Sequence, residues 1–273
     1  MFSRKTGYSM LVLFALASAA SASYIGITVT VSTPQLASGG SFPVNVSVVN
    51  SGDEDAHDVQ LSLQLPDGFQ SSPVFIGILS PNMPYDAVFE VNASDSAKAG
   101  TYPIVVKTHY ADANAYPFST VSPTFFRFKE PTPIMLRATM KEISVAAGGD
   151  TSQNLVLEAS NLDDKPHKIL VRFHLPDELK ADYDSTTLEL NPKDSGTVSV
   201  PVKSFGALAG SSYLVFASME YDDSGLHYSS TASGMVKIVA DGQSSTAMPS
   251  VSWLPLAVIL VLLAAFIVYQ LKK

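Results

Sequence analysis

The sequence contains no cysteine. This absence excludes disulfide bonds, thiolate nucleophiles, and cysteine-ligated zinc or iron–sulfur sites. Exported β-sandwiches of animals usually carry disulfides, so the composition favours an archaeal or bacterial source.

Positive charge is scarce in the central part of the chain. Of the 17 basic residues, four flank the apolar ends, which leaves 13 basic against 25 acidic residues and a formal charge of −12 in between. Such a surface repels phosphate backbones and anionic lipid headgroups. We therefore expect no nucleic-acid partner.

The motifs of common catalytic and cofactor sites are also missing. The sequence has no Gly-x-Ser-x-Gly elbow and no glycine-rich phosphate loop, and its five histidines do not have metalloprotease spacing. We expect no enzymatic activity and no cofactor. A surface hydrolase, whose paired carboxylates would meet only in the folded chain, is a third hypothesis of function.

Long apolar runs occur only at the two ends of the chain. Residues 1–22 have a basic start, an apolar core over 10–17 and small residues up to Ala22. This layout predicts a secretory signal peptide. An uncleaved N-terminal anchor is the alternative, although the apolar core is shorter than the roughly 20 residues that a bilayer needs.

The second apolar run, residues 251–269, is uncharged. As a helix it would be about 28 Å long, enough to span a bilayer. Lys272 and Lys273 follow it, as is typical of the cytoplasmic side. We predict a single-pass protein of the cell membrane, with its bulk outside the cell and a cytoplasmic tail over 270–273. A removable lipid-anchor signal is the alternative.

The part between these ends shows no convincing helical period. Short β-rich runs alternate with clusters of Gly, Pro, Asn, Asp and Ser. In residues 44–48 and 59–65 every second side chain is apolar, which is typical of an antiparallel sheet with one buried face. The predicted fold is all-β, with two tandem immunoglobulin-like antiparallel β-sandwiches and one C-terminal transmembrane helix.

A repeat divides this central part. Residues 57–67 (HDVQLSLQLPD) correspond to residues 167–177 (HKILVRFHLPD) at an offset of 110, and shorter matches follow. We infer one duplicated module, joined through a stiff, proline-containing link. The predicted parts are a signal peptide (1–22), two sandwiches (23–130 and 131–240), a flexible tether (241–250), the transmembrane helix (251–269) and the tail (270–273).

The turn residues of this module carry a family resemblance. Asn50-Ser51-Gly52, Pro66-Asp67-Gly68 and the stretch 99–106 together resemble prokaryotic immunoglobulin-like domains of the CARDB and NEW3 kind, the latter associated with alpha-galactosidase. The second half repeats them at Asn161 and at 175–177, without the glycine. The resemblance implies adhesion, spacer or accessory modules, common in archaeal surface and S-layer-related proteins, and carries over no catalytic residue.

An acidic loop is the one candidate for a metal site. Residues 51–58 contain four carboxylates and one imidazole between two predicted strands. Oxygen ligands suit Ca²⁺, and Asp53, Asp55 and Asp58 are the candidate ligands, although the spacing is not that of an EF-hand. A solvated turn is the alternative, and the spacing favours it.

Two further patterns concern the surface. Asn45 and Asn92 begin Asn-x-Ser sequons and are candidate glycosylation sites. Tyr110, Tyr116 and Phe118 form a candidate binding loop, because binding residues tend to lie on loops at the end of a sandwich. Rings buried in the core are the alternative.

These features lead to two main hypotheses of function. The first is a non-enzymatic, membrane-anchored cell-surface protein whose tandem domains contact an extracellular protein or glycan, or act as an envelope scaffold. The alternative is an accessory subunit of a membrane transport, translocation or processing complex. No oligomeric state is predicted.

Overall fold

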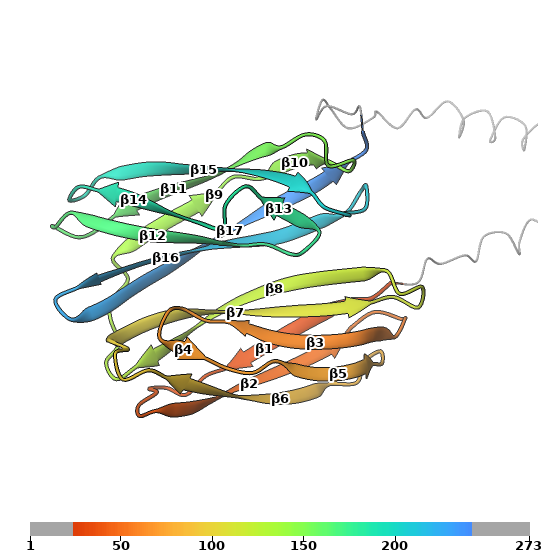
Figure 1. Cartoon of the computed structure of the whole chain (residues 1–273), viewed down its shortest axis with the longest axis horizontal. Coiled ribbons are helices and arrows are strands. Elements are labelled where there is room, and N and C mark those ends of the chain that lie inside the picture. The colour runs from red at the N-terminus through yellow and green to blue at the C-terminus, as the bar shows by residue number, and fades with distance from the viewer. Residues whose placement is uncertain (1–23, 242–273) are drawn as a thin grey trace, which may run out of the picture. The chain divides into compact units, whose positions relative to one another are not determined.

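The computed structural model describes residues 24–241, in which every regular element is a β-strand (Figure 1). The predicted all-β class is therefore confirmed for this range. The same residues include no helix with the length and hydropathy needed to cross a bilayer. The predicted signal peptide, transmembrane helix and tail lie outside the described residues, as does the tether beyond Asp241.

The N-terminal half of the described chain forms two facing sheets, which we call the N-sandwich. One sheet has the order β1-β2-β6-β4, and the facing strands are β5, β3, β7 and β8. The bounds are β1 (Ile27–Ser32), β2 (Ser41–Asn50), β3 (Ala56–Gln64), β4 (Phe69–Gln70), β5 (Val74–Leu79), β6 (Tyr85–Ala93), β7 (Ala99–Ala111) and β8 (Pro117–Phe128).

The C-terminal half repeats this arrangement, and we call it the C-sandwich. One sheet has the order β13-β15-β11-β9, and it faces β14, β12, β16, β17 and β10. All its pairs are antiparallel except β10 with β17, which is parallel. The bounds are β9 (Leu136–Met140), β10 (Ile143–Ala146), β11 (Gln153–Asn161), β12 (His167–His174), β13 (Leu179–Ala181), β14 (Ser185–Leu190), β15 (Ser195–Ser204), β16 (Ser212–Asp223) and β17 (Leu226–Val239).

Each sandwich has its own apolar core. In β2 the alternating residues Val44, Val46 and Val48 are almost fully buried, whereas the residues between them are more exposed. Burial of one such side chain stabilises the fold by about 1.5–3 kcal/mol. One core draws on residues 37–128 and the other on residues 136–238. Whether each half folds as an independent domain stays a prediction.

Two buried asparagines explain the repeated Asn motif. Asn50 donates from Nδ2 to the carbonyls of Glu54 and Leu79, and its Oδ1 accepts from two backbone amides. Asn161, which lies 111 positions later, donates in the same way to the carbonyls of Lys165 and Asn191. Each side chain ties the end of one strand to the loop that follows it and to a more distant segment.

The two sandwiches are joined more closely than a stiff link alone predicts. A parallel bridge pairs Leu226 with Ala99 and His227 with Gly100, so that their inner strands form one nine-stranded sheet. Gly100 is required here, because a Cβ atom would lie 2.2 Å from the carbonyl oxygen of His227. In the linker, Thr132 donates to that same carbonyl.

Candidate functional site

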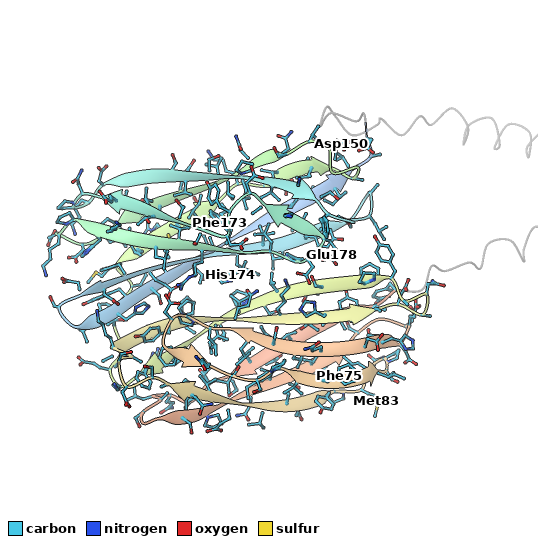
Figure 2. All side chains as sticks on the ribbon, in the orientation of Figure 1. Phe75, Met83, Asp150, Phe173, His174 and Glu178 are labelled. Carbon is cyan, nitrogen blue, oxygen red and sulfur yellow. The ribbon has the colours of Figure 1, made fainter. Side chains whose placement is uncertain are left out.

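The candidate site is a cavity of about 550 Å³ between the ends of β7 and β8 and two loops of the C-sandwich. We call it the aromatic cleft. Figure 2 labels Glu178, one of the residues that line it, between the two sandwiches. Its lining residues are Asp58, His109, Tyr110, Ala111, Ala115, Tyr116, Pro117, Phe118, Asp177, Glu178, Phe205 and Gly206.

Three of the rings are in contact with one another. Tyr110 stacks on Phe118 with ring centroids 5.5 Å apart, and Tyr116 lies tilted against Phe118 at 5.1 Å. Tyr116 also donates its hydroxyl to the carbonyl of Gly206, across the gap between the sandwiches. On the C-sandwich side, Phe205 is 66% exposed. The cleft therefore offers a continuous set of aromatic surfaces.

The turn between β7 and β8 holds Tyr116 in place. The carboxylate of Asp112 accepts hydrogen bonds from the backbone amides of Asn114 and Tyr116, at 2.9 and 2.8 Å. The bond from Tyr116 is the main reason why the pKa of Asp112 lies below its usual value. Ala115, between them, has a left-handed φ of 61°. An aspartate that caps its own turn is a common solution for such a loop.

Tyr110 is partly buried, as are Tyr116 and Phe118. Burial, followed by the nearby charge of Glu178, raises the pKa of the Tyr110 phenol to about 12. The hydroxyl therefore stays protonated at neutral pH and can donate a hydrogen bond.

A buried carboxylate forms the floor of the cleft. Glu178 is only 5% exposed, and its two oxygens accept hydrogen bonds from the amide and the hydroxyl of Ser119, at 2.6 and 2.8 Å. The hydroxyl oxygen in turn accepts from the amide of Asp177. This chain of donors fixes Glu178 as an acceptor and ties the N-sandwich to the C-sandwich.

Asp177 and Asp58 are more exposed than Glu178. Asp177 forms an ion pair with Lys107 and lies 2.9 Å from His109 Nδ1. Asp58 lies at a bulge of β3 and has a left-handed φ of 50°. Bulges often redirect a side chain, and the bulge brings Asp58 to the cleft.

The structure brings the three residues of the predicted binding loop, Tyr110, Tyr116 and Phe118, to one cleft. Sequence reasoning missed their counterparts in the second half, Glu178 and Phe205. One signal was present: Glu178 stands 110 positions after Gly68, where the repeated Leu-Pro-Asp-Gly string lacks its glycine. The two halves therefore differ in turn chemistry at the position that lines the cleft.

The predicted calcium ligands do not form one constellation. Asp53 accepts a hydrogen bond from the amide of Tyr24, and Asp58 belongs to the aromatic cleft. In residues 24–241, no group of three or more His, Cys, Asp or Glu side chains could hold a metal ion. The neighbouring Glu54 accepts from the amide of Ala113, which links the acidic loop to the β7–β8 turn.

Both sequon asparagines are exposed on the β1-β2-β6-β4 sheet. Asn45 lies in β2 opposite Val88, and Asn92 lies in β6 opposite Ser41. The neighbours of Asn45 in β2, Val44 and Val46, point into the core. A glycan on Asn45 would therefore project from the outer face of this sheet.

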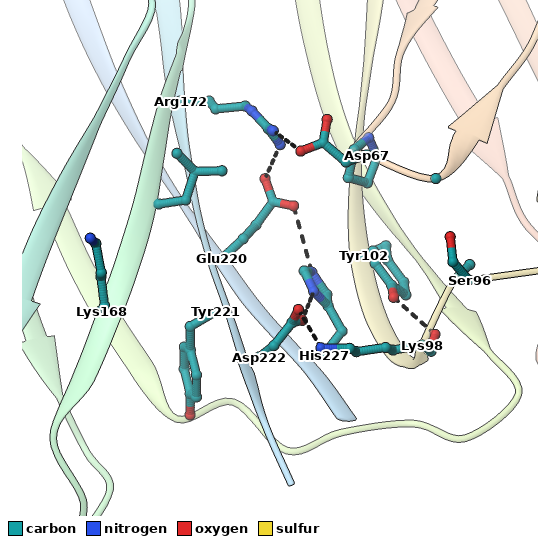
Figure 3. A pocket seen from close by; sticks show the side chains of 14 residues that line it. Asp67, Ser96, Lys98, Tyr102, Lys168, Arg172, Glu220, Tyr221, Asp222 and His227 are labelled. Carbon is teal, nitrogen blue, oxygen red and sulfur yellow. Dashed lines mark hydrogen bonds and ion pairs between the residues drawn. The ribbon is translucent and has the colours of Figure 1, made fainter. Parts of the chain in front are cut away.

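A second cavity between the sandwiches, of about 410 Å³, is polar (Figure 3). Arg172 reaches Asp67 Oδ2 at 2.6 Å and Glu220 Oε1 at 3.3 Å. On the other side of Glu220, His227 contacts both it and Asp222. This chain of polar contacts ends with the ion pair of Lys98 and Asp222.

Burial and hydrogen bonds both shift pKa values in this polar cavity. Burial alone would raise the pKa of Asp222, but hydrogen bonds from Lys98 and His227 outweigh it and lower the pKa. Tyr102 stacks on His227 with centroids 3.9 Å apart, and burial raises the pKa of its phenol. Arg172 and Lys98 are each paired with carboxylates of this cavity, so we regard it as a part of the interface and not as a ligand site.

Comparison with known proteins identifies one part of the chain. Residues 36–111 match the family described as the NPCBM-associated, NEW3 domain of alpha-galactosidase. The NEW3 resemblance is thus confirmed for the first sandwich. No curated protein matches the chain. The predicted CARDB likeness, archaeal source and S-layer relationship remain predictions.

Several solved structures are distantly similar. A variant of Salmonella alpha-2-macroglobulin shares 12% identity (TM-score 0.31), red sea bream transglutaminase 16% (TM-score 0.26) and the Escherichia coli chaperone DraB 14% (TM-score 0.28). The matches cover 78%, 89% and 40% of this chain, and 16%, 34% and 58% of those chains. The chain thus spans about a sixth of the first and about a third of the second of these proteins.

Proposed function

We propose that this protein is a non-enzymatic, membrane-anchored surface protein that contacts glycans through the aromatic cleft. The observation that carries the proposal is the cleft itself, in which the rings of Tyr116 and Phe118 lie beside the carboxylates of Asp177 and Glu178. Aromatic faces pack against the apolar faces of sugar rings, and carboxylates accept hydrogen bonds from hydroxyl groups. The NEW3 match over residues 36–111 supports contact with carbohydrate.

The hydrogen bonds of the cleft favour binding over hydrolysis. A glycosidase needs one carboxylic acid that donates a proton and a second carboxylate that acts on the sugar. Both oxygens of Glu178 accept hydrogen bonds from Ser119, and Asp177 is paired with Lys107 and His109. These partners favour Glu178 and Asp177 as hydrogen-bond acceptors, a role that suits the binding of sugar hydroxyl groups.

The location is proposed from the two ends of the sequence. The secretory pattern over 1–22 and the uncharged run over 251–269 support export and anchoring. Fractionation of the producing cells tests this proposal. The full chain should sediment with membranes and be digested by protease added to intact cells, whereas a chain that ends at Asp241 should be released. Protection of the full chain in intact cells would contradict it.

Binding is tested with immobilised glycans and the purified full chain. Phe205→Ala should weaken binding of any retained glycan by about tenfold, the amount expected for the loss of roughly 1.4 kcal/mol of ring contact. Phe75 is a matched control, because its exposed fraction is also 66% and it lies in β5, outside the cleft. Phe75→Ala should therefore bind as the unmodified chain does. Equal losses in both variants would remove the cleft as the binding site.

A further inference from the structure

The lining of the aromatic cleft is unbalanced in charge. Asp58, Asp177 and Glu178 contribute three carboxylates, whereas His109 is the one basic side chain among the described residues that line it. Lys107 offsets part of this charge through its ion pair with Asp177. A neutral sugar does not need such an excess of negative charge, but a cationic ligand would be attracted by it.

Among these carboxylates, Glu178 contributes a buried negative charge. Its carboxylate is nearly buried, and its hydrogen-bond donors, the amide and hydroxyl of Ser119, are neutral. Buried charges are costly unless an opposite charge accompanies them. Glu178 lines an open cavity, so a cation from solution that enters the cavity can supply that charge.

The rings beside Glu178 have the chemistry that binds ammonium groups. The faces of Tyr and Phe rings carry negative potential and attract cations within about 6 Å of the ring centroid. The protein already uses Phe205 in this way, since Lys180 Nζ lies 5.8 Å from the centroid of its ring. Tyr116 and Phe118 offer further faces next to the carboxylates.

We propose that the ligand of the aromatic cleft is a saccharide with a free, protonated amino group, which is held between Glu178 and the rings of Tyr116, Phe118 and Phe205. This inference rests on the proposed function, that is, on glycan contact at this cleft. It adds the property by which the glycan is selected. Acetylation of the amino group would remove both the charge and the selection.

The test compares two oligosaccharides of equal length, one of glucosamine and one of N-acetylglucosamine, in titration calorimetry with the full chain in detergent. We expect the glucosamine oligomer to bind at least about tenfold more tightly than its acetylated counterpart. A difference of this size is within the range of a partly desolvated cation–π contact. A lysine oligopeptide serves as a third probe, because it offers ammonium groups without a sugar.

Three variants, one of them a control, locate the selection. Glu178→Gln removes the charge and keeps one acceptor, so the preference for glucosamine should fall to less than threefold. Asp86→Asn, at an exposed position of β6, changes the net charge equally and should keep the preference. Glu178 is buried, so its substitution affects packing as well as charge. Lys180→Gln therefore gives an independent test of the charge selection. It removes a competing cation from Phe205 and should tighten glucosamine binding severalfold, with no effect on the acetylated oligomer.

The outcomes separate the two proposals. Equal binding of both oligomers, or tighter binding of the acetylated one, would overturn the charge selection and leave glycan contact intact. Binding of the lysine oligopeptide alone would overturn both proposals and make the cleft a protein-binding site. Binding of none of the three probes would overturn the selection of amino sugars. If the protein also retained none of the immobilised glycans, the proposed function would be overturned as well.

Discussion

His174 shows how a single residue responds to its place between the sandwiches (Figure 2). Its ring nitrogens contact Gln64 Oε1 at 2.8 Å and Ser218 Oγ at 3.1 Å. Burial is the main reason why its pKa falls to about 4; Arg172 and Lys107 lower it further, and Glu220 opposes them. The imidazole is therefore neutral in the folded protein at neutral pH.

This shift predicts a loss of stability in mild acid. As pH falls below about 6.5, the unfolded chain protonates His174 and the folded chain does not, so the free energy of unfolding decreases. The loss should approach about 3 kcal/mol near pH 4 and should not grow below it. Urea unfolding between pH 7 and pH 4 measures it. A His174→Gln variant should lose less stability over the same range, and identical slopes would contradict the prediction.

At the scale of elements, the strands and their turns could largely be predicted from the sequence. The alternation over 44–48 corresponds to the buried and exposed faces of β2, and the Asn-rich ends of strands correspond to Asn50 and Asn161. Both signals are local, because side-chain period and turn chemistry depend on neighbours in the chain. Partners of a buried asparagine that lie about 30 positions away, such as Leu79, could not be predicted in this way.

The two asparagines predict equivalent effects in the two sandwiches. Asn50→Ala and Asn161→Ala should each lower the free energy of unfolding by about 2–4 kcal/mol, because each leaves buried carbonyls and an amide without partners. Chemical denaturation measures both. Asn154 is exposed in β11, and Asn154→Ala should cost less than about 0.5 kcal/mol. If Asn50→Ala lowered the free energy of unfolding and Asn161→Ala did not, the duplicated turns would not be equivalent.

At the scale of the described molecule, the joined sandwiches position the site. The aromatic cleft takes its rings largely from the β7–β8 hairpin and its buried carboxylate from the loop before β13. Around it, Val105 and Val121 pack on Phe216 across the interface. The sequence predicted the rings of this cleft but not the opposite wall, because contacts between distant segments leave no period or spacing in the chain.

The charged interface predicts unequal costs for its two ion pairs. Asp67 is largely exposed, so Asp67→Ala should cost less than about 1 kcal/mol. Glu220 is only 5% exposed, and Arg172→Met would leave its charge buried with one partner fewer, at a cost of about 3 kcal/mol. Thermal or urea unfolding compares the two. The double variant Arg172→Met, Glu220→Gln should regain much of the loss; equal costs for Asp67→Ala and Arg172→Met would contradict this reading.

We propose that this protein binds a glycan in the aromatic cleft. Chemical-shift mapping by nuclear magnetic resonance tests it most directly, with the full chain in detergent titrated with the glucosamine oligomer. We expect the largest chemical-shift changes at Tyr116, Phe118 and Phe205, with a change at Glu178 as well. Shifts confined to the polar cavity around His227, or to the outer face of the β1-β2-β6-β4 sheet, would contradict it.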